Sequence, residues 1–176
     1  MNEECWVIVY YGDSLSNSYA SQRSYLPMYP DEVSDTQNAI WSSQQIIGRS
    51  NPLHAYTGTD SRNISFSMSL HREMYGSDAL NMNKIEKILR IFRAALYPKY
   101  NTIGLIPPRI RVVIGELAVE GILTSLSINW KKPIINKVYM ACDVSVQITG
   151  TSTKIYSTEE LGTSSNPYNV SLNYMR

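Results

Sequence analysis

The sequence predicts a mainly β protein with one amphipathic helix, an α+β fold built on a small antiparallel β-barrel or sandwich. Two patterns carry this prediction. Several segments alternate apolar and polar residues with the period of a half-buried strand. One segment instead repeats its apolar residues at offsets of three and four, as an amphipathic helix does. A chain of 176 residues is long enough for one domain with a proper core.

The first predicted strand runs from Cys5 to Tyr11, where β-branched and aromatic residues are followed by Gly12 and Asp13. Residues 13–45 are different, because they are rich in Ser, Gln, Asn and Asp and show no clear period. Loops longer than about 12–15 residues tend to be functional or disordered. We therefore interpret this stretch as an extended arm that docks on another surface, with a loop folded over its own domain as the alternative.

Turn-forming residues follow, namely Gly48, Asn51 with Pro52, and Gly58. They predict an irregular connection over residues 48–61 that lies on the surface. The extended arm or loop then covers residues 13–61 as a whole.

A regular strand begins at Arg62, because apolar residues occupy every second position up to His71. The alternating polar positions are almost all serine, which places one face against a core and the other in water. The predicted core residues of this strand are Ile64, Phe66, Met68 and Leu70.

The helix is predicted from about residue 84 to Tyr97, just before Pro98. Its predicted buried face includes Ile85, Ile88, Leu89, Phe92, Ala95 and Leu96. The opposite face is basic, with Lys87, Arg90 and Arg93. Such a face is either simply solvated or a binding surface for an acidic partner.

The second half of the chain predicts further strands over residues 109–114, 116–121, 122–130 and 138–148, with a break at 131–137. The strand predicted over residues 122–130 has Ile122, Leu126, Ile128 and Trp130 on one face. We expect Trp130, Val144 and Val146 to join the core. The predicted organisation is one β domain over residues 1–150 and a polar C-terminal arm over 151–176.

The charge balance disfavours binding to nucleic acid, since 16 Lys and Arg face 15 Asp and Glu for a net charge of +1. No segment reaches the length of a membrane span. The first residues are acidic, so we expect no signal peptide and no membrane partner.

We expect no enzyme activity, no cofactor and no metal. His54 and His71 have no second ligand at a metal-binding spacing, and no P-loop, G-x-S-x-G or G-x-G-x-x-G motif is present. Cys5 and Cys142 each lie in an apolar run and are expected to be buried free thiols.

The composition favours surfaces that contact other proteins, because the chain has 13 tyrosines and only 2 phenylalanines. Arg49 and Arg62 flank the turn segment and could bridge to a neighbour's carboxylates or tie down carbonyls of their own loop. Trp41 and Trp130 could be core fillers or interface anchors. The candidate interface residues are Tyr25, Tyr29, Trp41, Arg49, Arg62, Lys87, Arg90 and Arg93.

The order of these features resembles a known family. It consists of "WSSQQIIGRSNPLHAYTGTDSRNISFSMSLHRE", a helix ending "LYPKY", then "IPPRIRVVIG", "GILTSLSINWKKP" and "KVYMACDVSVQI". Over about residues 38–149 it is similar to the baseplate and tail-tube-proximal proteins of contractile-tailed bacteriophages and contractile injection systems, either tube initiators or LysM-type baseplate hubs. No LysM module follows here.

The resemblance implies a tail-tube type β domain with extended arms, acting as a structural part of a contractile tail baseplate where it meets the tail tube. It also implies a homo-oligomeric, six-fold ring, with tube, hub, wedge or sheath proteins as neighbours. The virion tail would be its location, after assembly in the bacterial cytoplasm. The alternative from another class is a small-ligand or carbohydrate-binding β-barrel module, with Trp130 and tyrosines lining a concave pocket.

Overall fold

The computed structural model describes residues 5–11, 24–75, 79–102 and 104–151. Residues 152–176 of the predicted C-terminal arm and residues 13–23 of the predicted N-terminal arm therefore lie outside the described residues. The elements in chain order are β1 (Cys5–Tyr11), β2 (Ser24–Tyr25), β3 (Glu32–Thr36), β4 (Ala39–Gln44), β5 (Leu53–Thr59), β6 (Asn63–His71), the 3-10 helix η2 (Arg72–Tyr75), α1 (Ala79–Ala94), β7 (Lys99–Asn101), β8 (Gly104–Ile106), β9 (Pro108–Ile114), β10 (Leu117–Ile135) and β11 (Val138–Gly150). No helix in this described part is long and apolar enough to cross a membrane.

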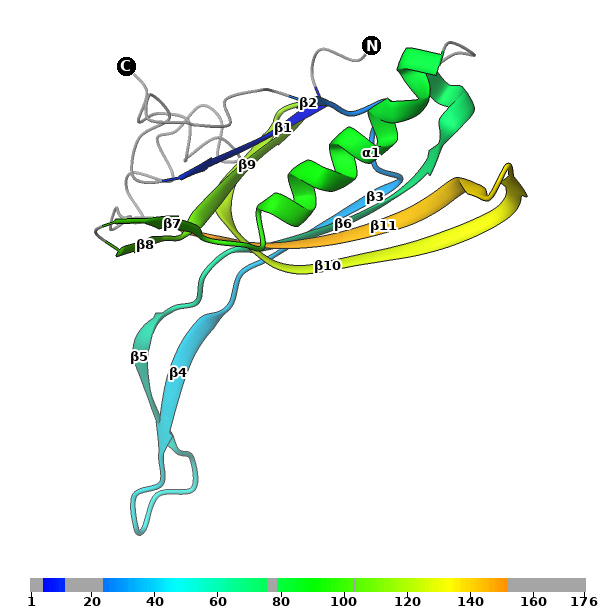
Figure 1. Cartoon of the computed structure of the whole chain (residues 1–176). Helices are drawn as coiled ribbons and strands as arrows, with labels where there is room; N and C mark the ends of the chain where they lie inside the picture. The colour runs from blue at the N-terminus through cyan, green and yellow to red at the C-terminus, as the bar shows by residue number, and fades with distance from the viewer. Residues whose placement is uncertain (1–4, 12–23, 76–78, 103, 152–176) are drawn as a thin grey trace.

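One curled antiparallel sheet forms the body, with the seven strands in the order β2-β1-β9-β10-β11-β6-β3. The long strand β10 belongs to both halves of this sheet, since residues 117–121 pair with β9 and the rest of the strand pairs with β11. The sheet bends along β10, and α1 lies in the hollow between the two halves (Figure 1). The mainly β fold with one helix is thereby confirmed, with the barrel or sandwich realised as a single curled sheet.

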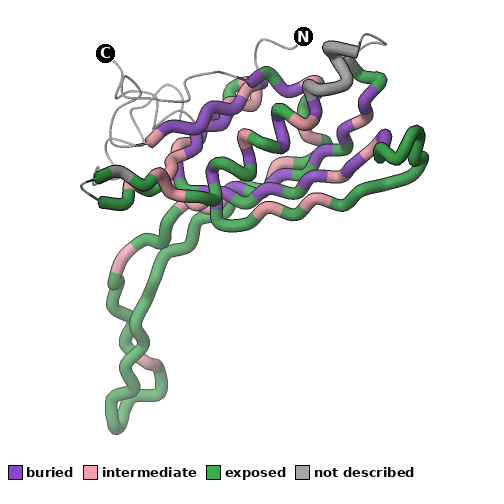
Figure 2. Tube along the Cα trace, in the orientation of Figure 1, coloured by how far each residue is buried: buried purple, intermediate pink, exposed green. Residues whose placement is uncertain are grey.

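The core lies between α1 and the sheet, and buried positions alternate with exposed ones along strands of the sheet (Figure 2). The structure places nine of the ten expected core residues there: Ile64, Phe66, Met68, Leu70, Ile85, Leu89, Phe92, Val144 and Val146. On α1 the side chains spaced by three and four are buried up to Ala95, whereas Leu96 is exposed. The helix itself ends at Ala94, earlier than predicted, and the chain continues in hydrogen-bonded turns to Tyr97.

The prediction that Trp130 fills the core is wrong, because its side chain is 39% exposed. Trp130 pairs with buried Cys142 and thus lies on the helix side of the sheet, as its spacing indicated. It is exposed because no described strand lies on the other side of β10 at this level. A bulge between Leu123 and Ser125 changes which residues face the core, so Leu123 is buried and Ile122 is exposed.

Three predicted irregular segments contain ordered strands. In the stretch 13–45, expected to be an extended arm that docks on another surface, β2 and β3 instead pair within the chain's own seven-stranded sheet. Residues 48–61 include β5, which pairs with β4 in a two-stranded ribbon and is no irregular connection. The predicted break at 131–137 is mostly strand as well, since β10 continues to Ile135. The chain reverses at Asn136 and Lys137, both with positive φ, which suits the twist of a tight hairpin.

Arg72 joins the end of β6 to two other elements. Its side chain is 7% exposed, and its guanidinium donates to the Tyr139 carbonyl oxygen at 2.9 Å and to Glu86 Oε1 at 2.8 Å. These contacts connect η2, β11 and α1. They therefore help to set the position of the helix over the sheet.

Among the described glycines, Gly121 leaves the least room for a side chain, so its substitution makes a sharp test. A Cβ at this position would lie 2.1 Å from the Thr149 carbonyl oxygen, whereas nothing lies within 4 Å of a Cβ at Gly58. Gly121→Ala is expected to lower the free energy of unfolding by about 1–3 kcal/mol or more, because the backbone of β11 must move. Urea denaturation should detect this loss, with Gly58→Ala changing stability by less than about 0.5 kcal/mol. Equal stability of the two variants would contradict the described approach of β11 to β10.

Candidate subunit interface

A two-stranded ribbon formed by β4 and β5 projects away from the body (Figure 1). Nearly all of its residues are exposed (Figure 2). Trp41 and Tyr56 form an edge-to-face pair with ring centroids 5.3 Å apart, yet they are 58% and 57% exposed. An isolated two-stranded hairpin is marginally stable in water. The ribbon therefore has the composition and the exposure of a segment that packs on another surface.

The root of the ribbon is held firmly to the body. Arg62 forms an ion pair with Asp35 on β3, donating from Nε to Asp35 Oδ1 at 2.9 Å. The Asp60 amide donates to the Asn38 carbonyl oxygen at 2.8 Å, which closes the two ends of the ribbon together. The Arg62 guanidinium thus pairs with a carboxylate on β3 of its own chain, which differs from both expected roles, a bridge to a neighbour and a contact with carbonyls of its own loop.

Among the described strands, the four-stranded part of the sheet formed by β10, β11, β6 and β3 has two open edges, and β2 forms a third at the other end of the sheet. At one side β3 pairs only with β6. At the other side β10 loses β9 beyond Gly121, so that residues 122–135 pair only with β11. The four strands between these edges are β10, β11, β6 and β3, and each pairs antiparallel with the next. Open edges offer unpaired backbone groups to another strand.

Apolar side chains on the helix side line both open edges. On β3, Val33 is half-buried and packs on the core. On β10, Leu126 and Ile128 are half-buried, and Trp130 stacks beside Tyr139 with ring centroids 5.8 Å apart. Further along the same strand, near its turn, two isoleucines are exposed: Ile134 and Ile135. A strand added at either edge would cover this apolar surface.

The other candidate interface residues lie on separate elements. Tyr25 on β2 and Tyr29 in the following loop are each 37% exposed. Arg49 lies in the exposed loop between β4 and β5. The three basic residues of α1 are exposed on the helix surface away from the sheet: Lys87, Arg90 and Arg93. The structure does not gather these residues into one site.

Sequence reasoning missed the ribbon and the open edge of β10. On the ribbon the overlooked exposed residues are Ile40, Ile46, Ile47, Leu53 and Tyr56. A hairpin pattern could have been recognised in this segment. The turn residues Gly48 and Asn51-Pro52 are flanked by two stretches that contain β-branched and aromatic residues, 39–44 before them and 53–59 after them.

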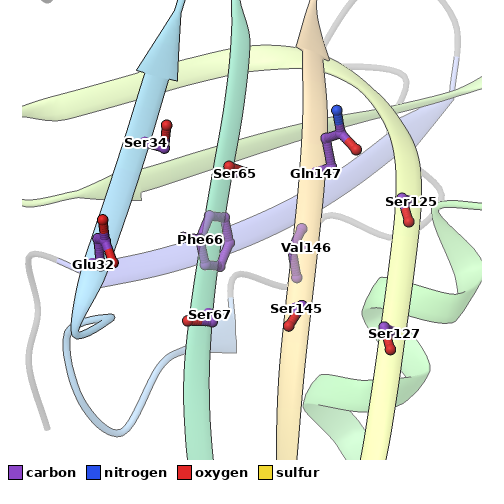
Figure 3. A pocket seen from close by; sticks show the side chains of 10 residues that line it. All are labelled: Glu32, Ser34, Ser65, Phe66, Ser67, Ser125, Ser127, Ser145, Val146 and Gln147. Atoms are coloured by element: carbon purple, nitrogen blue, oxygen red, sulfur yellow. The ribbon is translucent and has the colours of Figure 1, made fainter.

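The sheet face opposite α1 carries a shallow hollow of about 380 Å³. Polar side chains from four neighbouring strands surround it (Figure 3). Its lining consists of Glu32, Ser34, Ser65, Phe66, Ser67, Ser125, Ser127, Ser145, Val146 and Gln147. Phe66 and Val146 are buried on the helix side, so the accessible side chains are polar.

Nothing in the described residues suggests a catalytic or metal site. Cys5 and Cys142 are buried free thiols far apart in the sheet, and burial raises the pKa of the Cys5 thiol to about 11. Within the described ranges no group of three or more His, Cys, Asp or Glu could hold a metal ion. His71 lies near Glu73, whereas His54 lies on the exposed ribbon.

The family is decided by sequence comparison. Residues 4–132 match the family described as "Contractile injection system tube protein", and this match spans more than half of the 176-residue chain. The chain belongs to this tube protein family. As a family member it is a structural component of a contractile injection system. The matched region ends within β10, so that β11 lies beyond it.

Comparison with solved structures adds a distant likeness for this tube protein family member. A chain from the tail of an empty GTA particle, described with C6 symmetry, aligns with a TM-score of 0.40 and 12% sequence identity. The alignment covers 89% of this chain and 98% of the other. A likeness this low carries no argument about function. The comparison with curated proteins found no significant match.

Proposed function

We propose that this tube protein family member assembles into a ring by pairing the open edge of β10 with β3 of the next copy, at the junction of the tail tube and the baseplate. The observation that carries the proposal is the pair of open edges on one four-stranded stretch of sheet. A ring of six copies, in contact with tube, hub, wedge or sheath proteins, is the assembly we propose.

Strand direction supports this pairing. Each of the strands β10, β11, β6 and β3 runs opposite to its neighbour, so β3 runs opposite to β10. When β3 of one copy lies beside β10 of the next, the antiparallel alternation continues without a break. The same pairing buries the apolar side chains at both edges, including Val33 and Trp130. Repeating one such head-to-tail contact closes a ring when the rotation allows it.

The projecting ribbon supplies a second contact in this proposal. It extends well beyond the body, and its apolar side chains find no cover in the described part of their own chain. We assign it to a copy in the next ring or to the adjoining baseplate protein. Many such contacts act together in a closed assembly, so each can be modest in affinity.

The alternative, a small-ligand or carbohydrate-binding module, has little support. The hollow opposite α1 is shallow and lined mainly by serine. Its one aromatic lining residue, Phe66, is buried in the core and offers no exposed ring for stacking on a sugar. Trp130 lies at a strand edge on the other side of the sheet, away from this hollow.

Light scattering coupled to size-exclusion chromatography, followed by electron microscopy, tests the ring across a range of concentrations. The proposal expects closed rings or stacked tubes, formed by the chain alone or with a tail partner. Labelled copies in whole particles should then lie where the tube meets the baseplate. A chain that stays monomeric and binds no tail protein would overturn the proposed ring. Labels spread along the whole tube would overturn the proposed position at the junction.

Trp130→Glu tests the edge itself. It places a charge where the neighbour's β3 should pack, so we expect the concentration needed for assembly to rise by roughly tenfold or more. The thermal melt of the monomer should change little, because Trp130 lies outside the core. Tyr97→Ser removes a more exposed aromatic that belongs to neither β3 nor β10, and it should leave assembly unchanged. Normal assembly of the Trp130 variant would contradict pairing at this edge.

A further inference from the structure

The open edges of β3 and β10 carry opposite charges. Residues 31–36, which include β3, contain three carboxylates and no lysine or arginine: Asp31, Glu32 and Asp35. Residues 122–137, which include the open part of β10 and its turn, contain three lysines and no carboxylate: Lys131, Lys132 and Lys137. Complementary charges across a contact select the correct partner and fix the register of the contact. The two edges therefore match in charge as well as in strand direction.

Two of the three carboxylates on the acidic edge are available to a partner. Asp35 already forms an ion pair with Arg62 of its own chain. Within the part of the chain that the structure describes, neither Asp31 nor Glu32 forms an ion pair. Both residues are exposed. A cation supplied by a second copy can therefore reach them.

The lysines of β10 can serve as that cation. Lys131 contacts Asp143 on β11, yet its side chain remains 59% exposed. The hydrogen bonds from Lys131 and Ser69 hold the pKa of Asp143 below its usual range, so Asp143 stays ionised at neutral pH and keeps Lys131 beside the edge. An ammonium group has three donors, so Lys131 can bind a second carboxylate. Lys132 is exposed and forms no ion pair with any described residue.

Strand direction brings the acidic residues and the lysines together. In the antiparallel contact between copies, the start of β3 lies toward the end of β10. The two available carboxylates are at the start of β3, and the lysines are near the end of β10. The direction that continues the alternation of the sheet therefore also places the acidic end beside the basic end.

The pleat of the strands then narrows the register. Glu32 lines the hollow on the face opposite α1, whereas Val33 packs on the helix side. On β10, Lys131 contacts Asp143 on the face opposite α1, whereas Trp130 lies on the helix side. Placing Glu32 opposite Lys131 therefore sets Val33 opposite Trp130. Charge meets opposite charge on one face, and an apolar side chain meets an aromatic ring on the other.

This register also gives the ring a normal strand tilt, and this step rests on the proposed ring. Within one copy, paired residues lead from Glu32 through Ser67 and Ser145 to Ser127. When Glu32 of the next copy lies beside Lys131 and not beside Ser127, each copy of four strands is shifted by about four residues, or about one residue per strand. A closed barrel with eight strands and a shear of eight has the same ratio, and its strands tilt by about 36°. A contact without this shift would leave the strands untilted, which closed sheets do not adopt.

We propose that these pairs form the contact between copies and set its register: Glu32 with Lys131, Asp31 with Lys132, and Val33 with Trp130. We call this arrangement the acid–lysine register. A contact displaced by two residues in either direction would place Glu32 beside Asn129 or Pro133, and both charge pairs would be lost. The second copy of the chain is thus recognised by charge on one side of the edge and by apolar packing on the other.

Disulfide crosslinking tests the register directly. Glu32→Cys combined with Lys131→Cys is expected to give covalent oligomers, up to closed rings, when assembled protein is oxidised. The two positions of one chain lie on the outer strands of the four, about 14 Å apart, which is too far for a bond within the chain. Cys5 and Cys142 are buried and leave a low background.

Glu32→Cys combined with Ser127→Cys is the matched control, because it reports the register without a shift and should crosslink poorly. Efficient crosslinking of this control, with none for the Lys131 pair, would overturn the acid–lysine register while leaving the ring intact. Absence of rings from the unmodified chain would overturn the proposed function and this inference together.

Charge exchange between copies provides an independent test. Glu32→Lys and Lys131→Glu each place like charges at the contact, so each variant should need about tenfold more protein to assemble. When the two variants are mixed in equal amounts and alternate around the ring, every contact again has opposite charges. The mixture should then assemble within about threefold of the unmodified concentration. Arg90→Glu, on α1, reverses a charge away from both edges and should neither hinder assembly nor rescue Lys131→Glu.

A second exchange leaves the ion pair with Asp143 untouched. Asp31→Lys and Lys132→Glu alter two exposed side chains, so the thermal melt of each monomer should change little. The same mixing experiment should again restore assembly. If neither mixture assembles better than its single variants, while the unmodified chain forms rings, the acid–lysine register is wrong.

Discussion

Replacing Phe66 by alanine is expected to lower the free energy of unfolding by about 3–5 kcal/mol. Phe66 is buried on the helix side of β6, between Val33 of β3 and Val146 of β11. Its removal leaves a cavity in a layer where three strands meet the helix, and packed β strands collapse poorly around such a space. Urea denaturation followed by circular dichroism measures the change directly.

Ser67→Ala is the matched control, because Ser67 is the next residue of the same strand and points to the opposite face. Its stability should differ from that of the unmodified chain by less than about 0.5 kcal/mol. An unchanged denaturation midpoint for Phe66→Ala would show that the helix side of β6 is not a packed core.

Removal of the ribbon is expected to abolish stacking into tubes while leaving the body folded. The Asn38 carbonyl and the Asp60 amide are hydrogen-bonded at 2.8 Å, so residues 39–59 can be replaced by a tight Asn-Gly turn without strain on β3 or β6. The shorter connection should alter the stability of the monomer by no more than about 1 kcal/mol. Electron microscopy should then find single rings or monomers in place of tubes.

A milder variant tests whether the exposed aromatic pair of the ribbon, and not only the length of the ribbon, is needed for stacking. Trp41→Ser with Tyr56→Ser keeps the ribbon but removes its exposed aromatic pair, and it should weaken stacking in the same direction. Tubes of normal length from the chain without its ribbon would exclude the ribbon as a contact between rings.

Much of the body was predictable because its signals are local. Alternation over residues 62–71 and 138–148 and the helical spacing from Ile85 to Ala95 both report which side of an element is apolar. The helix and the strands accordingly lie where these patterns indicated, to within a few residues. The family resemblance rested on the same ordered patterns, and the match over residues 4–132 agrees with the contractile injection part of it.

The ribbon and the exposure of Trp130 were harder to predict from local patterns. Residues 39–44 and 53–59 carry a hairpin pattern, but many of their residues are polar, so this pattern is weaker than the alternation in the body. Their pairing with each other makes them strands. Trp130 has the spacing of a core residue, and it is exposed because β9 ends before reaching its level. Arg62 could have served a neighbour, and the position of Asp35 on the adjacent strand decided otherwise.

By itself, the sequence determined the class of fold, most faces of its strands and helix, and the small net charge of +1, because each of these depends on local spacing or on composition. Only the tertiary structure decided which edges stay open, where the ribbon points and that the serines of four separate strands form one face. These features depend on which strands become neighbours and where each one ends. Strand pairing joins residues as distant as Ser34 and Ser145 into one surface, and no local pattern records that pairing.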